Sequence, residues 1–257
     1  MIEFQQVCRS YGDNLAVNNL NLRVAAGELY ALLGQNGAGK TTAIKMLVGL
    51  MRPESGTIHV GGYDVVSQTR QATALVGYVP DQPFLYDKLS GYEVLQFIAR
   101  MYGMDARQAA RAIDREVQRF ELADFINELT ETYSHGMKQR TIFATALLHD
   151  PTVLVVDEPM VGLDPHSVRL VKDLLHQEVA GGMCVLMSTH TLTAAEEIAS
   201  RVGIMSHGQL LFDGTLELLR ERFPAEKQSL EAMYLALTEN HDRLPQHHAR
   251  ELPGMPT

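Results

Sequence analysis

Short apolar runs alternate with longer amphipathic stretches along most of the chain. The short runs are rich in Leu, Val and Ile and are bounded by Gly, Asp or Asn, which predicts β-strands separated by turns. The run at 153–156 is apolar at every position, as is typical of a parallel strand covered on both faces. The predicted strands lie at residues 2–4, 20–24, 29–33, 57–60, 153–156, 184–187, 202–205 and 209–212.

Helical spacing replaces this pattern in the middle of the chain. Ser90 followed by Glu93 has the sequence of a capping box, and Asp105 is placed to cap the next helix. A loop is predicted at 133–136 and a further helix at 137–148. Three more helices are predicted between the strands, at 40–51, from 165 to about 181, and at 191–200.

These elements predict an α/β fold interrupted by a helical insertion. Residues 1–85 and 149–220 form the predicted core, with a mostly parallel sheet and an antiparallel β subdomain at its N-terminal end. Residues 86–148 form an inserted α-helical subdomain. Residues 221–257 form a C-terminal helix and a tail, which holds prolines and histidines without apolar periodicity from about residue 241, so we expect disorder there.

The most informative motif is GQNGAGKT at residues 34–41, which follows an apolar strand and opens a helix. This is the context of a P-loop, whose glycines let consecutive backbone N–H groups turn toward phosphate oxygens at the positive end of the helix. Lys40 can reach the β- and γ-phosphates, and the Thr41 hydroxyl can ligate Mg²⁺. The predicted nucleotide-binding set is Gly34, Asn36, Gly37, Gly39, Lys40, Thr41 and Thr42.

Acidic residues follow a second apolar strand. Asp157 and Glu158 come directly after residues 153–156. A P-loop enzyme needs an acid here to hold Mg²⁺, so we expect Asp157 to orient the metal and Glu158 to polarise the attacking water. His190 follows the next buried strand, and we expect it to contact the γ-phosphate. A lone histidine at a strand end can instead be structural.

Composition and charge narrow the classes of function. The chain has 257 residues and a net charge of -9, which disfavours a general nucleic-acid binder because phosphate affinity requires clustered Lys and Arg. Cys8 and Cys184 lie far apart, so we expect two reduced thiols rather than metal ligands. The sequence shows neither a signal peptide nor a window of roughly 18 apolar residues. We therefore expect a soluble chain that acts on a membrane only through a partner.

Together these motifs resemble the nucleotide-binding subunit of ATP-binding-cassette (ABC) transporters, up to about residue 220. The resemblance implies a RecA-like P-loop NTPase core. The family's diagnostic Leu-Ser-Gly-Gly-Gln loop corresponds to residues 133–140, YSHGMKQR, and its short separation from Glu158 fits the family. Without the other motifs this stretch reads as a capped helix start. Four positions match, namely Ser134, Gly136, Gln139 and Arg140, whereas Tyr133, His135 and Met137 depart.

The resemblance implies that the site is shared between two subunits. In this family two subunits meet head to tail and trap two ATP molecules, each between one subunit's P-loop and the other's signature loop. The corresponding signature-loop residues here are Ser134 and Gly136. Residues 161–164 resemble the loop that couples the two sites, although Asp164 can also cap a helix. Tyr11 falls where the family places an aromatic residue against adenine, although a tyrosine in an exposed turn can serve packing alone.

One position departs from the family in a loop that joins the core to the helical segment. The family usually has a glutamine there, which contacts Mg²⁺ or the water and moves with the transmembrane partner. Aligning residues 77–80 places Asp81 at this position, as a candidate metal ligand, and Gln82 next to it. The sequence leaves open which of the two takes the role.

The resemblance implies an ATP-binding and ATP-hydrolysing subunit of an ABC membrane transporter that uses ATP and Mg²⁺. Its implied partners are a separate transmembrane permease subunit and a second nucleotide-binding subunit, as a homodimer or heterodimer, with no nucleic acid. We expect a cytoplasmic protein, peripheral on the inner face of the cell membrane. The degenerate signature loop and residues 230–238 resemble the drug-, sodium- and polysaccharide-exporter subgroup, although amphipathic packing explains the latter equally well.

Two other classes of function stay open. One is a non-transport ABC ATPase that acts on ribosomes or nucleic acid. Such proteins commonly carry two cassettes or a long coiled-coil insertion, and this chain shows one cassette and no sustained heptads. The other is a regulatory module that binds ATP without turnover, and the complete set of Lys40, Thr41, Asp157, Glu158 and His190 argues against it.

Overall fold

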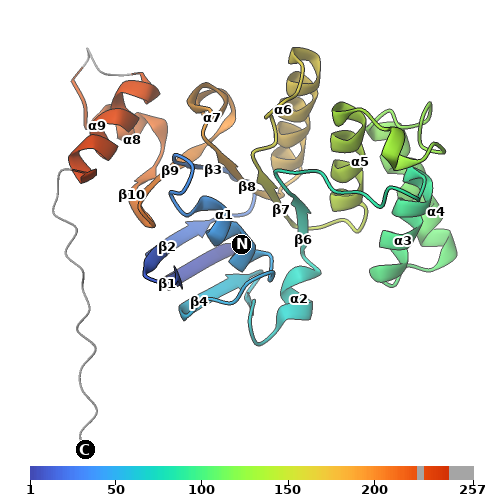
Figure 1. The fold of residues 1–257 in the computed structure, drawn as a ribbon, viewed down its shortest axis with the longest axis horizontal. Coiled ribbons are helices and arrows are strands. Elements are labelled where there is room, and N and C mark those ends of the chain that lie inside the picture. The colour runs from blue at the N-terminus through green and yellow to red at the C-terminus, as the bar shows by residue number, and fades with distance from the viewer. Residues whose placement is uncertain (225–228, 243–257) are drawn as a thin grey trace, which may run out of the picture.

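A computed structural model describes residues 1–224 and 229–242 of the chain, and in those residues the strands form two sheets (Figure 1). In the larger sheet β10 pairs antiparallel with β9, and the other neighbours are parallel. The predicted α/β fold with a mostly parallel sheet is confirmed. The order of this sheet is β10 (Gln209–Gly214), β9 (Arg201–Ser206), β3 (Leu29–Leu33), β8 (Cys184–Thr189), β7 (Val153–Asp157) and β6 (Val76–Val79).

The smaller sheet is antiparallel and lies at the N-terminal end of the chain. Its order is β2 (Asn14–Val24), β1 (Ile2–Tyr11), β4 (Ser55–Val60) and β5 (Tyr63–Asp64). β1 is much longer than the predicted strand at 2–4. Register shifts follow Phe4 and Val7, and Gln6 has a φ of 50°, so the strand loses the alternation that predicts one.

An all-helical segment connects β6 to β7. It contains α3 (Gly91–Met101), α4 (Ala106–Arg119), the 3₁₀ turn η1 (Thr130–Thr132) and α5 (His135–Leu147). Figure 1 shows α3, α4 and α5 together at one end of the molecule, away from the small sheet. The capping box predicted at Ser90 and the cap predicted at Asp105 are both present, and Asp105 also forms a capping box with Gln108. The predicted loop at 133–136 is wrong at its end, because Ser134 accepts from the Met137 N–H at 3.3 Å and caps a helix that begins at His135.

The remaining helices flank the larger sheet, except for α2, which packs on β4 and β5 of the smaller sheet. α1 ends earlier than the predicted helix at 40–51, because Gly49 has a φ of 77° and stops the helical path. The short helices α2 and α8 are not predicted from periodicity. The predicted tail beyond residue 242 lies outside the described residues. These helices are α1 (Lys40–Leu47), α2 (Thr69–Thr73), α6 (Pro165–Ala180), α7 (Leu192–Ile198), α8 (Leu216–Arg220) and α9 (Leu230–Asp242).

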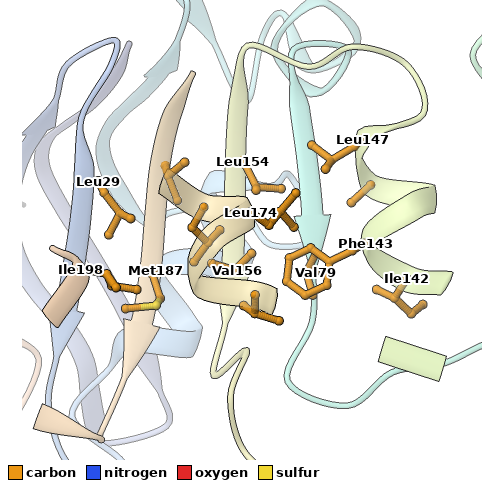
Figure 2. Packing of buried hydrophobic residues seen from close by; sticks show 14 of the residues in the cluster. Leu29, Val79, Ile142, Phe143, Leu147, Leu154, Val156, Leu174, Met187 and Ile198 are labelled. Carbon is orange, nitrogen blue, oxygen red and sulfur yellow. The ribbon is translucent and has the colours of Figure 1, made fainter. Parts of the chain in front are cut away.

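The two faces of the larger sheet bury separate apolar clusters. On one face Leu154, Val156 and Met187 belong to a cluster with residues of α3 to α7. Figure 2 shows the part of this cluster that lies beneath α5, α6 and α7. On the other face Val153 and Val155 pack with residues of α1 and the small sheet. Because side chains alternate along a strand, coverage of both faces explains why residues 153–156 are apolar throughout. Within the described ranges, no helix has both the length and the apolar character needed to cross a membrane.

Candidate functional site

The predicted site residues meet where three parallel strands end. In the register of the sheet Leu33 lies beside Thr189, and Asp157 lies beside Ser188. The P-loop follows the end of β3, Glu158 follows the end of β7, and His190 follows the end of β8. Open α/β sheets bind ligands at the carboxyl ends of their strands, so the topology places this chemistry at the expected edge.

A cleft of about 440 Å³ opens at this edge. Its volume lies within the range of roughly 300–1,000 Å³ that is usual for small-molecule sites. It gathers predicted residues from the P-loop, from β1 and from the segments after β6 and β7. Asn14, Ala16 and Gln35 also line it and were not predicted. The lining residues are Tyr11, Asn14, Ala16, Gln35, Asn36, Gly37, Gly39, Lys40, Thr41, Thr42, Asp81 and Glu158.

Two glycines of the P-loop are required by close backbone contacts. A Cβ on Gly39 would lie 2.2 Å from the Ala16 carbonyl oxygen, and one on Gly34 would lie 2.6 Å from the Met205 carbonyl oxygen. Gly39 also has a φ of 103° and immediately precedes α1. No described side chain caps this helix end, so its first N–H groups remain available to an anion.

Lys40 is the cation at the bottom of the cleft. The residue is only 5% exposed, and its Nζ donates to the Gly34 carbonyl at 2.6 Å and lies 3.7 Å from Glu158 Oε1. Burial lowers the pKa of Lys40, and the charges of Glu158 and Asp157 only partly oppose this. A poorly solvated ammonium group of this kind is stabilised when an anionic phosphate arrives.

Asp157 is a buried carboxylate, and Ser188 Oγ donates a hydrogen bond to it. Burial raises the pKa of Asp157, and the hydroxyl groups of Ser188 and Thr41 oppose that shift. Ser188 was not predicted to act here, because its contact with Asp157 depends on the register of β8 with β7.

The donor chemistry around Asp157 fits Mg²⁺. Mg²⁺ prefers oxygen ligands and is usually held by one or two carboxylates together with waters and substrate phosphates. Thr41 and Asp157 offer a hydroxyl and a carboxylate at one point. Over the part of the chain that the structure describes, no group of three or more His, Cys, Asp or Glu residues forms a complete protein cage.

Glu158 is fixed between two strands. It has a φ of 50°, a left-handed conformation that costs a non-glycine residue about 1–3 kcal/mol. Its N–H donates to the Ser188 carbonyl at 3.1 Å, and its Oε1 lies 3.0 Å from His190 Nδ1. The His190 N–H donates to Glu158 Oε2 at 3.3 Å. The structure therefore brings His190 to Glu158, as well as to the strand end where it was predicted.

Tyr11 and Asp81 lie at the rim of the cleft. Tyr11 is 47% exposed, so its ring is accessible. Asp81 lines the cleft and Gln82 does not, within the residues described. Burial, Asp157 and Asp81 together raise the pKa of Tyr78 to about 12, which shows that Asp81 adds negative potential at this end. The geometry favours Asp81 over Gln82 for contact with a bound ligand.

Ser134 and Gly136 lie elsewhere. Neither lines this cleft in the described structure, and Gly136 lines a separate cavity of about 240 Å³ between α4, α5 and α6. A Cβ on Gly162 would lie 3.5 Å from His135 Nε2, so the signature loop contacts the 161–164 loop of its own chain. Asp164 accepts from the Ser167 N–H at 3.0 Å and caps α6.

Comparison with known proteins now identifies the family. The family model described as ABC transporter matches residues 17–161. The chain is 37% identical over 212 residues to the daunorubicin resistance ATP-binding protein DrrA3 of Streptomyces coeruleorubidus, covering 82% of this chain and 67% of the relative. It is 41% identical over 221 residues to the Nod factor export ATP-binding protein I of Burkholderia orbicola, covering 86% and 72%.

A solved structure agrees with the sequence relatives. A protein described as the ATP-binding subunit of an ABC transporter superposes with a TM-score of 0.86 at 31% identity, covering 92% of this chain and 99% of that one. These relatives are ATP-binding proteins of exporter type, as the motifs of this chain predicted. The chain belongs to the ABC transporter family, as an ATP-binding subunit of the kind that hydrolyses ATP.

Proposed function

We propose that this chain powers outward transport through a separate transmembrane permease, from the cytoplasmic face of the membrane. Support comes from relatives whose names concern drug resistance and Nod factor export. Further support comes from the groups expected to hydrolyse ATP, which lie together at one edge of the larger sheet. The observation that carries the proposal is the convergence of Lys40, Asp157, Glu158 and His190 at adjoining strand ends.

In the proposed reaction, this chain's residues position ATP and a water molecule. Lys40 exchanges its contacts with Glu158 and the Gly34 carbonyl for phosphate oxygens, and the N–H groups at the start of α1 bind the same phosphates. Glu158 is then free to accept a proton from the attacking water. His190 holds the Glu158 carboxylate in place. Thr41 and Asp157 would hold Mg²⁺, with Asp81 nearby, and the ion would neutralise charge on the phosphates.

We propose that the second half of the site comes from another subunit, either a second copy or a close relative. Ser134 and Gly136 are placed at the start of α5 but outside the chain's own cleft. The start of a helix of this length can bind an anion, so it can close on nucleotide held by a partner. ATP binding would then close the pair, and loss of phosphate would open it.

An exposed aromatic patch of Phe84, Tyr86 and Phe97 supplies a docking surface for the transmembrane permease. The rings of Phe84 and Tyr86 lie 5.9 Å apart, and those of Tyr86 and Phe97 lie 5.7 Å apart. All three side chains are exposed, and Phe84 is 74% exposed. Contiguous exposed apolar groups mark interaction surfaces. Because Phe84 is three residues from Asp81, movement of this patch can reach the cleft.

We predict that replacing Phe84 and Phe97 together with Ser weakens binding of the permease more than tenfold, since buried aromatic anchors dominate interfaces. The measurement is co-purification in detergent with a multi-span membrane protein from the cells that make this chain, together with the ATPase activity of the chain alone. Tyr63→Ser, at an exposed position on β5, serves as the matched control. Undiminished co-purification of the double variant would refute this docking surface.

A further inference from the structure

The ring of Tyr11 is held by the segment that follows α1. The Tyr11 hydroxyl donates to Met51 Sδ at 3.2 Å. The guanidinium carbon of Arg9 lies over the ring, 5.7 Å from its centroid. Arg9 also donates to the Arg52 carbonyl at 3.2 Å and lies 3.8 Å from Glu54. One edge and one face of the ring are thereby occupied, which leaves the other face for a ligand.

α1 connects this bracket to the phosphate loop. The helix begins at Lys40, and near its other end the Lys45 carbonyl accepts from the Met51 N–H at 3.1 Å. Ile44 and Met46 are fully buried against the core, so the helix cannot shift without repacking. A chain of direct contacts therefore runs from the phosphate-binding lysine, along α1, to the hydroxyl of Tyr11.

We propose that Met51 is a positioning residue, which fixes the Tyr11 ring at a set distance from the phosphate loop. This inference rests on the proposed adenine-stacking role of Tyr11. A nucleotide uses both ends of the cleft, and it gains full affinity only when the stacking ring is already placed for the base. The thioether acts by accepting the hydroxyl hydrogen bond, and Arg9 and Glu54 hold the far face of the ring.

The test is a double-mutant cycle with two ligands. Met51→Leu keeps the side-chain volume but removes the acceptor, and Tyr11→Phe keeps the ring but removes the donor. Each change is expected to raise the KM for ATP about two- to tenfold, the range for one lost hydrogen bond, with kcat unchanged. The double variant should be no worse than either single variant. Tripolyphosphate, a competitive inhibitor without a base, should keep its inhibition constant.

Two further variants separate the ways of failing. Tyr11→Ala should raise the KM for ATP at least as much as Tyr11→Phe. Met183→Leu is the control, because Met183 precedes β8 at the end of the strand away from the cleft, and it should leave the KM unchanged. If Tyr11→Ala raises the KM but Met51→Leu does not, the role of Met51 is wrong. Additive effects, or an equal loss of tripolyphosphate binding, would also overturn it. If Tyr11→Ala has no effect, the stacking role itself is wrong and the inference fails with it.

Discussion

Several residues around the cleft are held in states that cost free energy. Lys40 is a buried ammonium group with a lowered pKa, and Asp157 is a buried carboxylate with a raised one. Glu158 adopts a left-handed backbone conformation. Strained and desolvated groups gather at sites where a ligand or a reaction relieves them. In the proposed reaction ATP and Mg²⁺ would supply the missing charges, with phosphate oxygens pairing with Lys40 and the cation pairing with Asp157.

Glu158→Gln should separate binding from hydrolysis. The amide has the same size as the carboxylate but cannot accept a proton, so we expect turnover to fall at least about 100-fold. ATP should still raise the unfolding temperature, because Lys40 and the P-loop are intact. Steady-state ATPase assays and thermal unfolding with and without ATP measure both effects. Glu3→Gln on β1 is the control, and wild-type turnover in Glu158→Gln would contradict the proposed role.

At the residue scale the sequence predicted groups that follow strands and missed groups that depend on register. Lys40 and Asp157 could be found because a glycine-rich loop or an acid after an apolar run is visible locally. The hydrogen bond from Ser188 to Asp157 depends on how β7 pairs with β8. Asn14 and Ala16 reach the cleft from a strand of the other sheet, and no local pattern indicates that approach.

At the scale of elements, His149 ties the helical segment to the core. Its ring stacks on Tyr102 after α3, with centroids 3.7 Å apart and planes 10° apart. Its Nε2 lies 3.2 Å from the Val76 carbonyl of β6. Its Nδ1 is buried, and among the described residues it has no hydrogen-bond partner. Burial lowers the pKa of His149, so the neutral ring, with the proton on Nε2, fits this position.

This contact predicts a pH dependence of stability. The pKa of His149 is lower in the folded state than the usual 6.5, so the unfolded chain binds the proton more readily. The stabilisation that the neutral ring provides is therefore present above about pH 6.5 and is lost as the pH falls through the folded pKa.

His149→Phe keeps a stacking ring but cannot be protonated, so it isolates this effect. We expect the wild type to be the more stable protein at pH 7.5, by about 1 kcal/mol for the lost hydrogen bond. That advantage should shrink as the pH is lowered to about 5.5, where an unshifted histidine is mostly protonated. Thermal unfolding across this range measures the difference, and His176→Phe at an exposed position on α6 is the control. An advantage that grows with acidity would contradict the assignment.

The elements that the sequence misjudged share a physical cause. Register shifts in β1 and the positive φ of Gln6 remove the alternation that a strand prediction needs. α5 begins at His135, because Ser134 acts as a cap even though the next residues are not apolar. The capping box at Ser90 and the cap at Asp105 were predicted correctly because capping depends only on residues within one turn.

At the scale of the whole molecule, we propose that the fold presents half of a catalytic site. The two faces of the large sheet are buried in separate apolar clusters. This packing on both sides holds the strand ends beside the P-loop in place. The start of α5 does not contribute to the chain's own cleft, since Ser134 and Gly136 lie outside it. Two chains in head-to-tail contact would complete each other, with each P-loop facing the signature loop of its partner.

The most direct test mixes two inactive chains. Lys40→Ala removes the phosphate-binding cation, and Ser134→Arg blocks the surface that would meet the partner's nucleotide, so each variant alone should lack ATPase activity. In a mixed pair one site is doubly defective and the other is intact. Random pairing should therefore restore about a quarter of the wild-type activity. A mixture that stays as inactive as its two components, although both remain folded by thermal unfolding, would contradict a site shared between two copies of this chain.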